Sequence, residues 1–273
     1  MSLFADAARM EKQNIPFAMV IITESRGSAP RHDGQMLVMP EGNILGTVGG
    51  GMMERKVIDE ALVALQDGKS RLFHGRMTRN GQDAVGSDCG GAMSVFISVH
   101  GVRPRLLLVG GGHVNRAIAH AASALNFNLL VTDIYAPNLQ AGDFPAGTSL
   151  LLSHSFADAL KEIVPDENTY VVIATNSSDL EVVSLLMGYP CRYLGLLASR
   201  RKVHTFTQHF MASGLTSSQL APLRAPIGFD IGAETPEEIA ISVLAEILQV
   251  KNGASGMLLD CTSDCLSVTG ETA

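Results

Sequence analysis

The sequence predicts an α/β protein of two domains: a Rossmann-like doubly wound parallel sheet in the C-terminal part, preceded by a smaller α+β domain. Over residues 1–101, strand-like segments surround one amphipathic helix, whereas over residues 102–250 buried apolar strands alternate with helices. Such an alternation is typical of a parallel sheet that is covered on both faces. A chain of 273 residues is also long enough for two domains of ordinary size.

The first domain is expected to contain three strands and one strong helix. Apolar residues indicate strands over residues 17–23, 35–40 and 92–99. A helix is expected to begin after three consecutive glycines, because apolar side chains then recur at helical spacing. These side chains are Val57, Ile58, Ala61, Leu62 and Leu65.

The second domain is expected to begin with a strand and to alternate strands with helices. Strands are predicted over residues 105–110, 128–133, 149–154, 169–175 and 192–199, and helices over 114–127, 156–164 and 235–250. The last helix has a strong start signal, with Thr235 as N-cap, Pro236 in the first helical position and Glu238 to complete a capping box. Residues 251–273, rich in Gly, Ser and Thr, are interpreted as a C-terminal tail.

Composition and charge argue against several classes of protein. The net charge is −7 and the isoelectric point is near 5.6, whereas a general nucleic-acid binder presents a basic surface to phosphates. No apolar run reaches the roughly 18 residues that a membrane helix needs, and the first residues lack the pattern of a signal peptide. We therefore expect a cytoplasmic protein without nucleic-acid or membrane partners.

A glycine motif in the second domain predicts a phosphate site. Gly110, Gly111 and Gly112 follow a strand and open a helix, where backbone N–H groups and the positive helix end can bind a phosphate. Asp133 ends the next strand, 21 residues after Gly112, where a carboxylate can accept hydrogen bonds from ribose hydroxyls. Asn115 stands in the place of the third glycine of the dinucleotide motif. The alternative is a tight turn that binds no ligand.

His113 follows these glycines directly and has two interpretations. It either contributes to the phosphate site or is a solvent-facing residue at the start of the helix.

A second glycine cluster lies in the first domain. Gly49, Gly50 and Gly51 lead into the predicted helix, with Thr47 nearby as a hydroxyl donor, so a second anion site is expected here. Glu54 falls in the first turn of that helix, where a carboxylate favours the helix dipole. The preceding Gly/Pro loop adds three polar side chains, which either recognise an anion or are ordinary solvated residues. They are Arg26, Ser28 and Arg31.

The cysteines are expected to be free thiols, because they are too few and too scattered for a disulfide framework. They are Cys89, Cys191, Cys261 and Cys265. Cys89 precedes Gly90 and Gly91, and this accessible, flexible setting favours thiolate character and binding of a soft metal. Cys191 leads into an apolar strand and is expected in the core. The two tail cysteines fall short of a zinc site with four ligands.

Six blocks of the sequence together resemble a known family. In order, they are GSAPRHDGQMLV, GTVGGGMMERKVIDEA, DCGGAMSVFI, LLLVGGGHV, LASRRK and PIGFDIGAETPEEIAISVLAEI. They resemble the xanthine dehydrogenase accessory proteins of the XdhC/CoxI type, from about Phe17 to Val250. Two positions depart from the family: Asn176 follows Thr175 where many members have histidine, and Asn115 replaces a smaller residue.

The resemblance implies a molybdenum cofactor chaperone. Members of this family bind the molybdenum cofactor (molybdopterin), support its sulfuration and deliver it to an apo molybdenum hydroxylase of the xanthine dehydrogenase type. Their ligand-binding cysteine precedes a Gly-Gly pair, so the resemblance assigns cofactor and metal binding to Cys89, and a cysteine desulfurase is expected as a further partner. The client enzyme, the mono- or dinucleotide form of the cofactor, and the choice between a monomer and a homodimer remain open.

The chemistry of the residues is compatible with this resemblance. Molybdopterin carries a phosphate and a dithiolene-bound metal soft enough to accept a thiolate, and two anion sites and one accessible thiol suit it. Arg200, Arg201 and Lys202 directly follow a predicted strand and are expected to contact the ligand at the carboxyl edge of the sheet.

Two other functions are alternatives. One is an NAD(P)-dependent oxidoreductase that uses the same glycine turn, although we recognise no acid or base for hydride transfer beyond a weak candidate, His154. The other is a nucleotide-sensing interaction protein without chemistry of its own.

Overall fold

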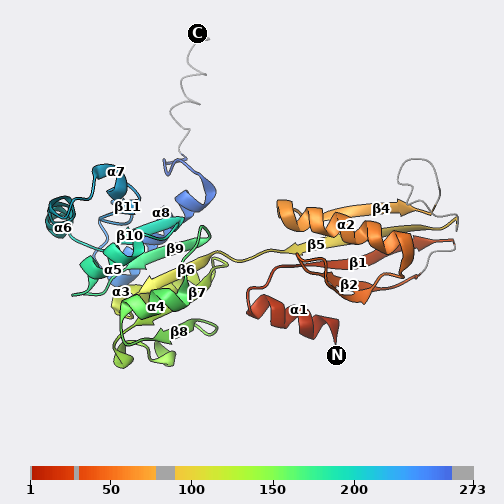
Figure 1. Ribbon diagram of the computed structural model, residues 1–273, viewed down its shortest axis with the longest axis horizontal. Coiled ribbons are helices and arrows are strands. Elements are labelled where there is room, and N and C mark those ends of the chain that lie inside the picture. The colour runs from red at the N-terminus through yellow and green to blue at the C-terminus, as the bar shows by residue number, and fades with distance from the viewer. Residues whose placement is uncertain (1, 28–30, 78–89, 260–273) are drawn as a thin grey trace, which may run out of the picture. The chain divides into compact units, whose positions relative to one another are not determined.

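The computed structural model describes residues 2–27, 31–77 and 90–259 (Figure 1). The chain divides into two compact units, Met1–Arg103 and Pro104–Ala273. The sequence places the boundary after residue 101. In the part of the chain that the structure describes, no helix is both long enough and apolar enough to cross a membrane.

The first unit is an antiparallel sheet of five strands with a helix on each face. The strand order is β3-β2-β1-β5-β4. The elements are α1 (Leu3–Lys12), β1 (Phe17–Arg26), β2 (Gln35–Val38), β3 (Ile44–Thr47), α2 (Gly51–Asp67), β4 (Arg71–Arg76) and β5 (Ala92–His100). The smaller α+β domain that the sequence predicts is therefore confirmed.

Strand β1 shows how this sheet fills two cores. Phe17 packs with α1 and β2, whereas its neighbour Ala18 belongs to the larger core beneath α2. Successive side chains of a strand point to opposite faces, so both helices find apolar partners on the same strand. Val57 and Ala61 of α2 are fully buried in the larger core, as the helical spacing predicts.

The structure contains α1, β3 and β4 in addition to the elements expected in this unit. β3 and β4 are the edge strands of the sheet, and most of their side chains stay partly or fully exposed. Edge strands need less apolar sequence than central strands, which explains why their pattern is weak.

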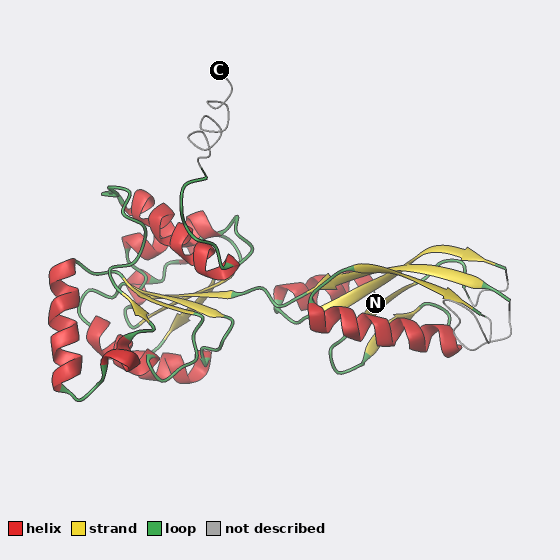
Figure 2. Ribbon diagram, turned by 90° about the horizontal axis from the view of Figure 1, so that it is seen from above, coloured by secondary structure: helices red, strands yellow, loops and turns green. Residues whose placement is uncertain are grey.

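The second unit is a parallel sheet of six strands with helices on both faces, as Figure 2 shows. The strand order β11-β10-β9-β6-β7-β8 is that of a Rossmann fold, which confirms the predicted fold class. The strands are β6 (Arg105–Val109), β7 (Asn128–Asp133), β8 (Ser149–Leu152), β9 (Thr169–Ile173), β10 (Tyr193–Leu196) and β11 (Leu223–Arg224). The helices are α3 (His113–Ala122), α4 (Phe156–Ile163), α5 (Asp179–Leu186), α6 (Arg200–Ala212), α7 (Ser217–Leu220) and α8 (Pro236–Asn252).

Alternate residues of the central strands supply two different cores. Leu106 and Leu108 of β6 pack beneath α3 and α8, whereas Leu107 and Val109 pack beneath α4, α5 and α6. All four side chains are fully buried, and each contributes about 1.5–3 kcal/mol of hydrophobic free energy. Burial on both faces explains why the strands are continuous apolar runs.

The β7–β8 connection and the start of α8 complete this unit. Between β7 and β8 the chain forms only the short 3-10 helices η1 (Ala136–Asn138) and η2 (Ala141–Asp143). α8 starts with the predicted capping box, in which Thr235 Oγ1 accepts a hydrogen bond from the Glu238 amide at 3.3 Å and the Glu238 carboxylate accepts one from the Thr235 amide at 3.0 Å.

Candidate functional site

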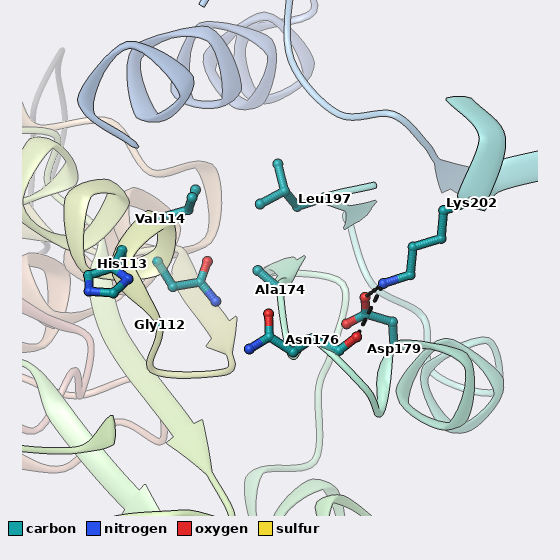
Figure 3. Close-up of a pocket in the computed structure, with 9 residues that line it drawn as sticks. Gly112, His113, Val114, Ala174, Asn176, Asp179, Leu197 and Lys202 are labelled. Atoms are coloured by element: carbon teal, nitrogen blue, oxygen red, sulfur yellow. Dashed lines mark hydrogen bonds and ion pairs between the residues drawn. The ribbon is translucent and has the colours of Figure 1, made fainter. Parts of the chain in front are cut away.

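A pocket lies at the carboxyl edge of the parallel sheet, where β6 and β9 are neighbours (Figure 3). The chain leaves β6 toward β7 and leaves β9 toward β10, so this is the switch point at which open α/β sheets bind ligands. The pocket has a volume of about 280 Å³. Its lining consists of Gly112, His113, Val114, Asn115, Ala174, Asn176, Asp179, Leu197 and Lys202.

The three predicted glycines differ in the space that surrounds them in the turn beside this pocket. Gly110 has a φ of +100°, and a Cβ atom there would lie 2.3 Å from the carbonyl oxygen of Ala174. A Cβ on Gly111 would lie 2.3 Å from the carbonyl oxygen of Asn138. A Cβ on Gly112 would instead meet no atom within 4 Å. The first two glycines therefore permit close packing, whereas Gly112 keeps the space at the start of α3 open.

Asn115 joins the start of α3 to the strand beneath it. Its side chain is 0% exposed, and Nδ2 donates to the carbonyl oxygens of Val109 at 3.1 Å and Gly110 at 2.7 Å. Its Oδ1 is buried and has no hydrogen-bond partner among the residues that the structure describes. A buried acceptor without a donor costs about 1–3 kcal/mol, so the site contains an unmet hydrogen-bonding requirement. The sequence marked Asn115 only as a departure from the glycine motif.

Charged and polar side chains form the opposite wall of the pocket. Lys202 forms an ion pair with Asp179, which is buried and also accepts a hydrogen bond from the Thr175 amide at 2.8 Å. The Lys202 ammonium lies 3.4 Å from the carbonyl oxygen of Asn176. These donors balance the charge of Asp179 and hold the lysine at the pocket. The sequence predicted basic contacts from the first turn of α6, but no sequence pattern singled out Asp179.

Of the predicted arginines and histidine, His113 lines this pocket, whereas Arg200 and Arg201 are not among its lining residues. Arg200 and Arg201 open α6 and are exposed, one and two residues before Lys202. His113 is the first residue of α3 and is exposed at the pocket. Contact of these three side chains with a ligand stays a prediction.

Asp133, expected to accept from a ribose, holds the glycine turn. The carboxylate is 3% exposed and accepts from the Gly111 amide at 2.7 Å, the Tyr135 amide at 2.9 Å and Asn138 Nδ2 at 2.9 Å. Arg116 adds a further link, because it donates to the Gly111 carbonyl at 2.8 Å and pairs with Asp143 at 2.7 Å. The ribose contact stays a prediction, although three donors of the chain already use this carboxylate.

The described residues among those predicted in the first unit lie toward one end of its sheet. In the antiparallel order, β1 and β3 end where β2 and β5 begin. A Cβ on Gly27 would lie 3.1 Å from the Gly90 carbonyl oxygen, and one on Gly34 would lie 2.8 Å from the Thr47 carbonyl oxygen. Arg31 donates to the Thr47 carbonyl at 3.4 Å.

The glycine loop before α2 already binds a carboxylate of the chain itself. Glu54 accepts from the amides of Val48 at 3.0 Å and Gly50 at 3.1 Å and from the Thr47 hydroxyl. Burial raises the pKa of this carboxyl, but the hydrogen bonds outweigh that effect and lower its pKa overall. Gly49, Gly50 and Gly51 all have positive φ, which shapes this loop. Binding of an external anion here stays a prediction.

Of the four cysteines, Cys191 lies within the described residues. Cys89, Cys261 and Cys265 lie outside the described residues, whereas Gly90, directly after Cys89, donates to the Met77 carbonyl at 3.0 Å. Cys191 packs partly buried against a core, as expected, and burial raises the pKa of its thiol to about 11. Among the described residues, no group of three or more His, Cys, Asp or Glu side chains is placed to hold a metal ion.

Fold and site together define a protein whose second unit is a Rossmann-type unit with a pocket at its switch point and whose first unit has glycine loops toward one end of a sheet. Two family models match the chain: the XdhC Rossmann domain over residues 106–247, and the XdhC and CoxI family over residues 10–75. The chain belongs to the XdhC/CoxI family, which confirms the resemblance of its sequence blocks.

Three relatives place the chain within this family. It is 58% identical over 259 residues to the uncharacterized protein YqeB of Escherichia coli strain K12, covering 95% of this chain and 48% of YqeB. It is 31% identical over 160 residues to a probable xanthine dehydrogenase subunit of Bacillus subtilis strain 168, covering 58% of this chain and 46% of that protein. It is 24% identical over 271 residues to the molybdenum cofactor insertion chaperone PaoD of E. coli K12, covering 85% and 83%. The chain thus spans about half the length of the first two.

Proposed function

We propose that this protein is an accessory protein that binds the molybdenum cofactor and delivers it to a molybdenum hydroxylase. Membership of the XdhC/CoxI family and similarity to the insertion chaperone PaoD support this role. The client in the proposal is an apo enzyme of the xanthine dehydrogenase type. Sulfuration of the cofactor, with a cysteine desulfurase as the source of sulfur, and a cytoplasmic location belong to the same proposal.

The observation that carries the proposal is the open space at the start of α3, at Gly112; we call this space the cradle. Gly112 caps this helix without a side chain, no acid lies in its first turn, and a Cβ on Gly112 would project into open space. A phosphate is the group that such a helix end favours, and molybdopterin carries one. The unpaired Oδ1 of Asn115 adds an acceptor for a ring N–H group. The residues of the pocket therefore fit the phosphorylated end of the cofactor.

Cys89 is the proposed metal ligand, as the family resemblance implies. When bound, the cofactor supplies the molybdenum centre that the client enzyme uses. The residues of this chain hold and release it: thiolate sulfur binds soft metals, and backbone N–H groups bind phosphate. Gly90 and Gly91 follow this cysteine at the end of the sheet where Thr47 and Arg31 also lie.

Replacing the proposed thiol tests this function. We expect Cys89→Ala to lower the amount of molybdenum cofactor retained by the purified chain by about tenfold or more, because the soft ligand is lost. Cofactor would be measured by its absorbance, by mass analysis of the released ligand and by metal content. The free energy of unfolding should stay unchanged.

Cys191→Ala is the matched control, since a thiol with a pKa of about 11 is almost entirely protonated at neutral pH. It should keep the cofactor. Full retention by Cys89→Ala, together with a marked loss of stability, would show instead that Cys89 is a packing residue.

A further inference from the structure

The pocket at the switch point contains an acceptor for which the described residues of the chain offer no donor. Nδ2 of Asn115 donates to two carbonyl oxygens, which can only accept, so the orientation of this amide is fixed. Its Oδ1 therefore belongs on the other side, where it is buried and unpartnered in a residue that lines the pocket. Buried polar atoms in native proteins almost always have a partner. A bound molecule with an N–H or O–H group would provide it.

The surroundings of this acceptor favour an anion. The first residues of α3 line the pocket, and their N–H groups lie at the positive end of the helix dipole. Figure 3 shows Lys202 on the opposite side of the pocket from His113. Asp179, the acid in this lining, is offset by Lys202 and by hydrogen bonds from Thr175, so its charge is already compensated.

On the side that faces β7, residues of the chain itself already occupy the space and the hydrogen bonds at the glycine turn. A dinucleotide in a Rossmann fold places a ribose on the carboxylate that ends the second strand. In this structure that carboxylate, Asp133, already accepts from Gly111, Tyr135 and Asn138. The Asn138 carbonyl also packs so closely on Gly111 that a Cβ there would lie 2.3 Å away. The pocket opens instead beside the residues that follow β9 and β10.

We infer that the second unit binds a phosphorylated N-heterocycle of about mononucleotide size, with the phosphate at the start of α3, across the pocket from Lys202, and a ring N–H donating to Oδ1 of Asn115. A volume of about 280 Å³ is just below the usual range for ligand pockets and is of the size that one such group fills. If the proposed function holds, on which this identification of the natural ligand rests, the heterocycle is the pterin of the molybdenum cofactor.

GMP is a suitable probe, because it joins a phosphate monoester to the 2-amino-4-oxopyrimidine ring that pterins also contain. Isothermal titration calorimetry of the full chain would compare GMP, inorganic phosphate and NAD. We expect GMP to bind at least about tenfold more tightly than inorganic phosphate, because it also reaches the acceptor of Asn115. NAD should bind no more tightly than GMP, because the β7 side offers its adenosine no free carboxylate.

Two variants separate the contacts. Asn115→Leu should weaken GMP binding by about tenfold and leave the binding of inorganic phosphate unchanged. Lys202→Met should weaken the binding of both ligands, because it leaves the negative charge of Asp179 in the pocket without its ion-pair partner. Lys161→Met is the matched control for the lysine, since Lys161 pairs with Asp158 at 3.2 Å on the surface of α4, and it should change neither. Thermal unfolding of each variant checks its fold.

Each outcome decides the inference. NAD binding about tenfold more tightly than GMP, or GMP affinity that Asn115→Leu does not change, would overturn it. If Asn115→Leu does not fold, the affinities of the three ligands for the unmodified chain and for Lys202→Met decide the question. A chain that retains the molybdenum cofactor but does not bind GMP overturns this inference alone. A chain that binds GMP as expected but never carries the cofactor contradicts the proposed function alone.

Discussion

At the scale of single residues, neighbouring glycines of one turn should respond differently to substitution. We expect Gly112→Val to keep the stability of the chain and to weaken the binding of phosphorylated ligands, because its side chain would fill the open cradle. Gly110→Ala should lower the free energy of unfolding by about 1–3 kcal/mol, because φ is +100° and the new methyl would meet the Ala174 carbonyl. Chemical denaturation and ligand titration of both variants measure this contrast. Unchanged affinity of Gly112→Val for every phosphorylated ligand tested would contradict phosphate binding in the cradle at the start of α3.

Glu54 allows a second prediction at this scale, on pH. Its pKa is lower in the folded chain, so its contribution to stability is fully present above about pH 4.5 and is lost as the pH falls through the folded pKa. Glu54→Gln should cost about 1 kcal/mol of unfolding free energy at neutral pH, and the two proteins should converge in acid. Urea denaturation at several pH values measures the difference.

Glu60→Gln is the control on the same helix, because Glu60 forms a partly exposed pair with Arg71 at 2.9 Å that contributes little. A cost of Glu54→Gln that stays constant down to about pH 3 would show that the charge of Glu54 is not the cause.

At the scale of elements, the two capping boxes of the second unit provide a matched comparison. Thr235 begins α8, a helix of 17 residues that packs in the core with α3, whereas Thr216 begins α7, a helix of four residues without buried side chains. Thr235→Ala should lower the free energy of unfolding by about 1 kcal/mol, and Thr216→Ala by clearly less. Equal effects in chemical denaturation would indicate that the caps act only locally.

Elements buried on both sides were predictable, and elements at edges were not. β6 and β9 are fully apolar over most of their length, and the sequence predicts both. β4 alternates exposed and half-buried residues and contains Gly75, so its pattern resembles that of a loop. α3 ends at Ala122, earlier than the apolar periodicity suggests, because Asn126 adopts a positive φ and the chain turns toward β7.

At the scale of the whole molecule, the sequence located the pocket better than it described the contacts around it. The strand, glycine turn and helix at Gly110–Gly112 are consecutive, so local sequence predicts their geometry. The pairing of Lys202 with Asp179 joins residues from two helices, and the free oxygen of Asn115 depends on which carbonyls its amide reaches. Such contacts follow from tertiary packing, which a single sequence does not encode in any local pattern.

The proposed function implies that the whole chain acts as a carrier of the cofactor. Its four cysteines do not form the pattern that an iron–sulfur cluster needs to carry electrons, and the acid and lysine of the pocket neutralise each other. We therefore predict that the purified chain alone oxidises neither NADH nor xanthine. Mixed with an apo molybdenum hydroxylase and a source of sulfurated cofactor, it should raise the activity of that enzyme, and steady-state assays with each component omitted measure the dependence. Oxidation of xanthine by the chain alone, with NAD as acceptor, would instead support the oxidoreductase alternative.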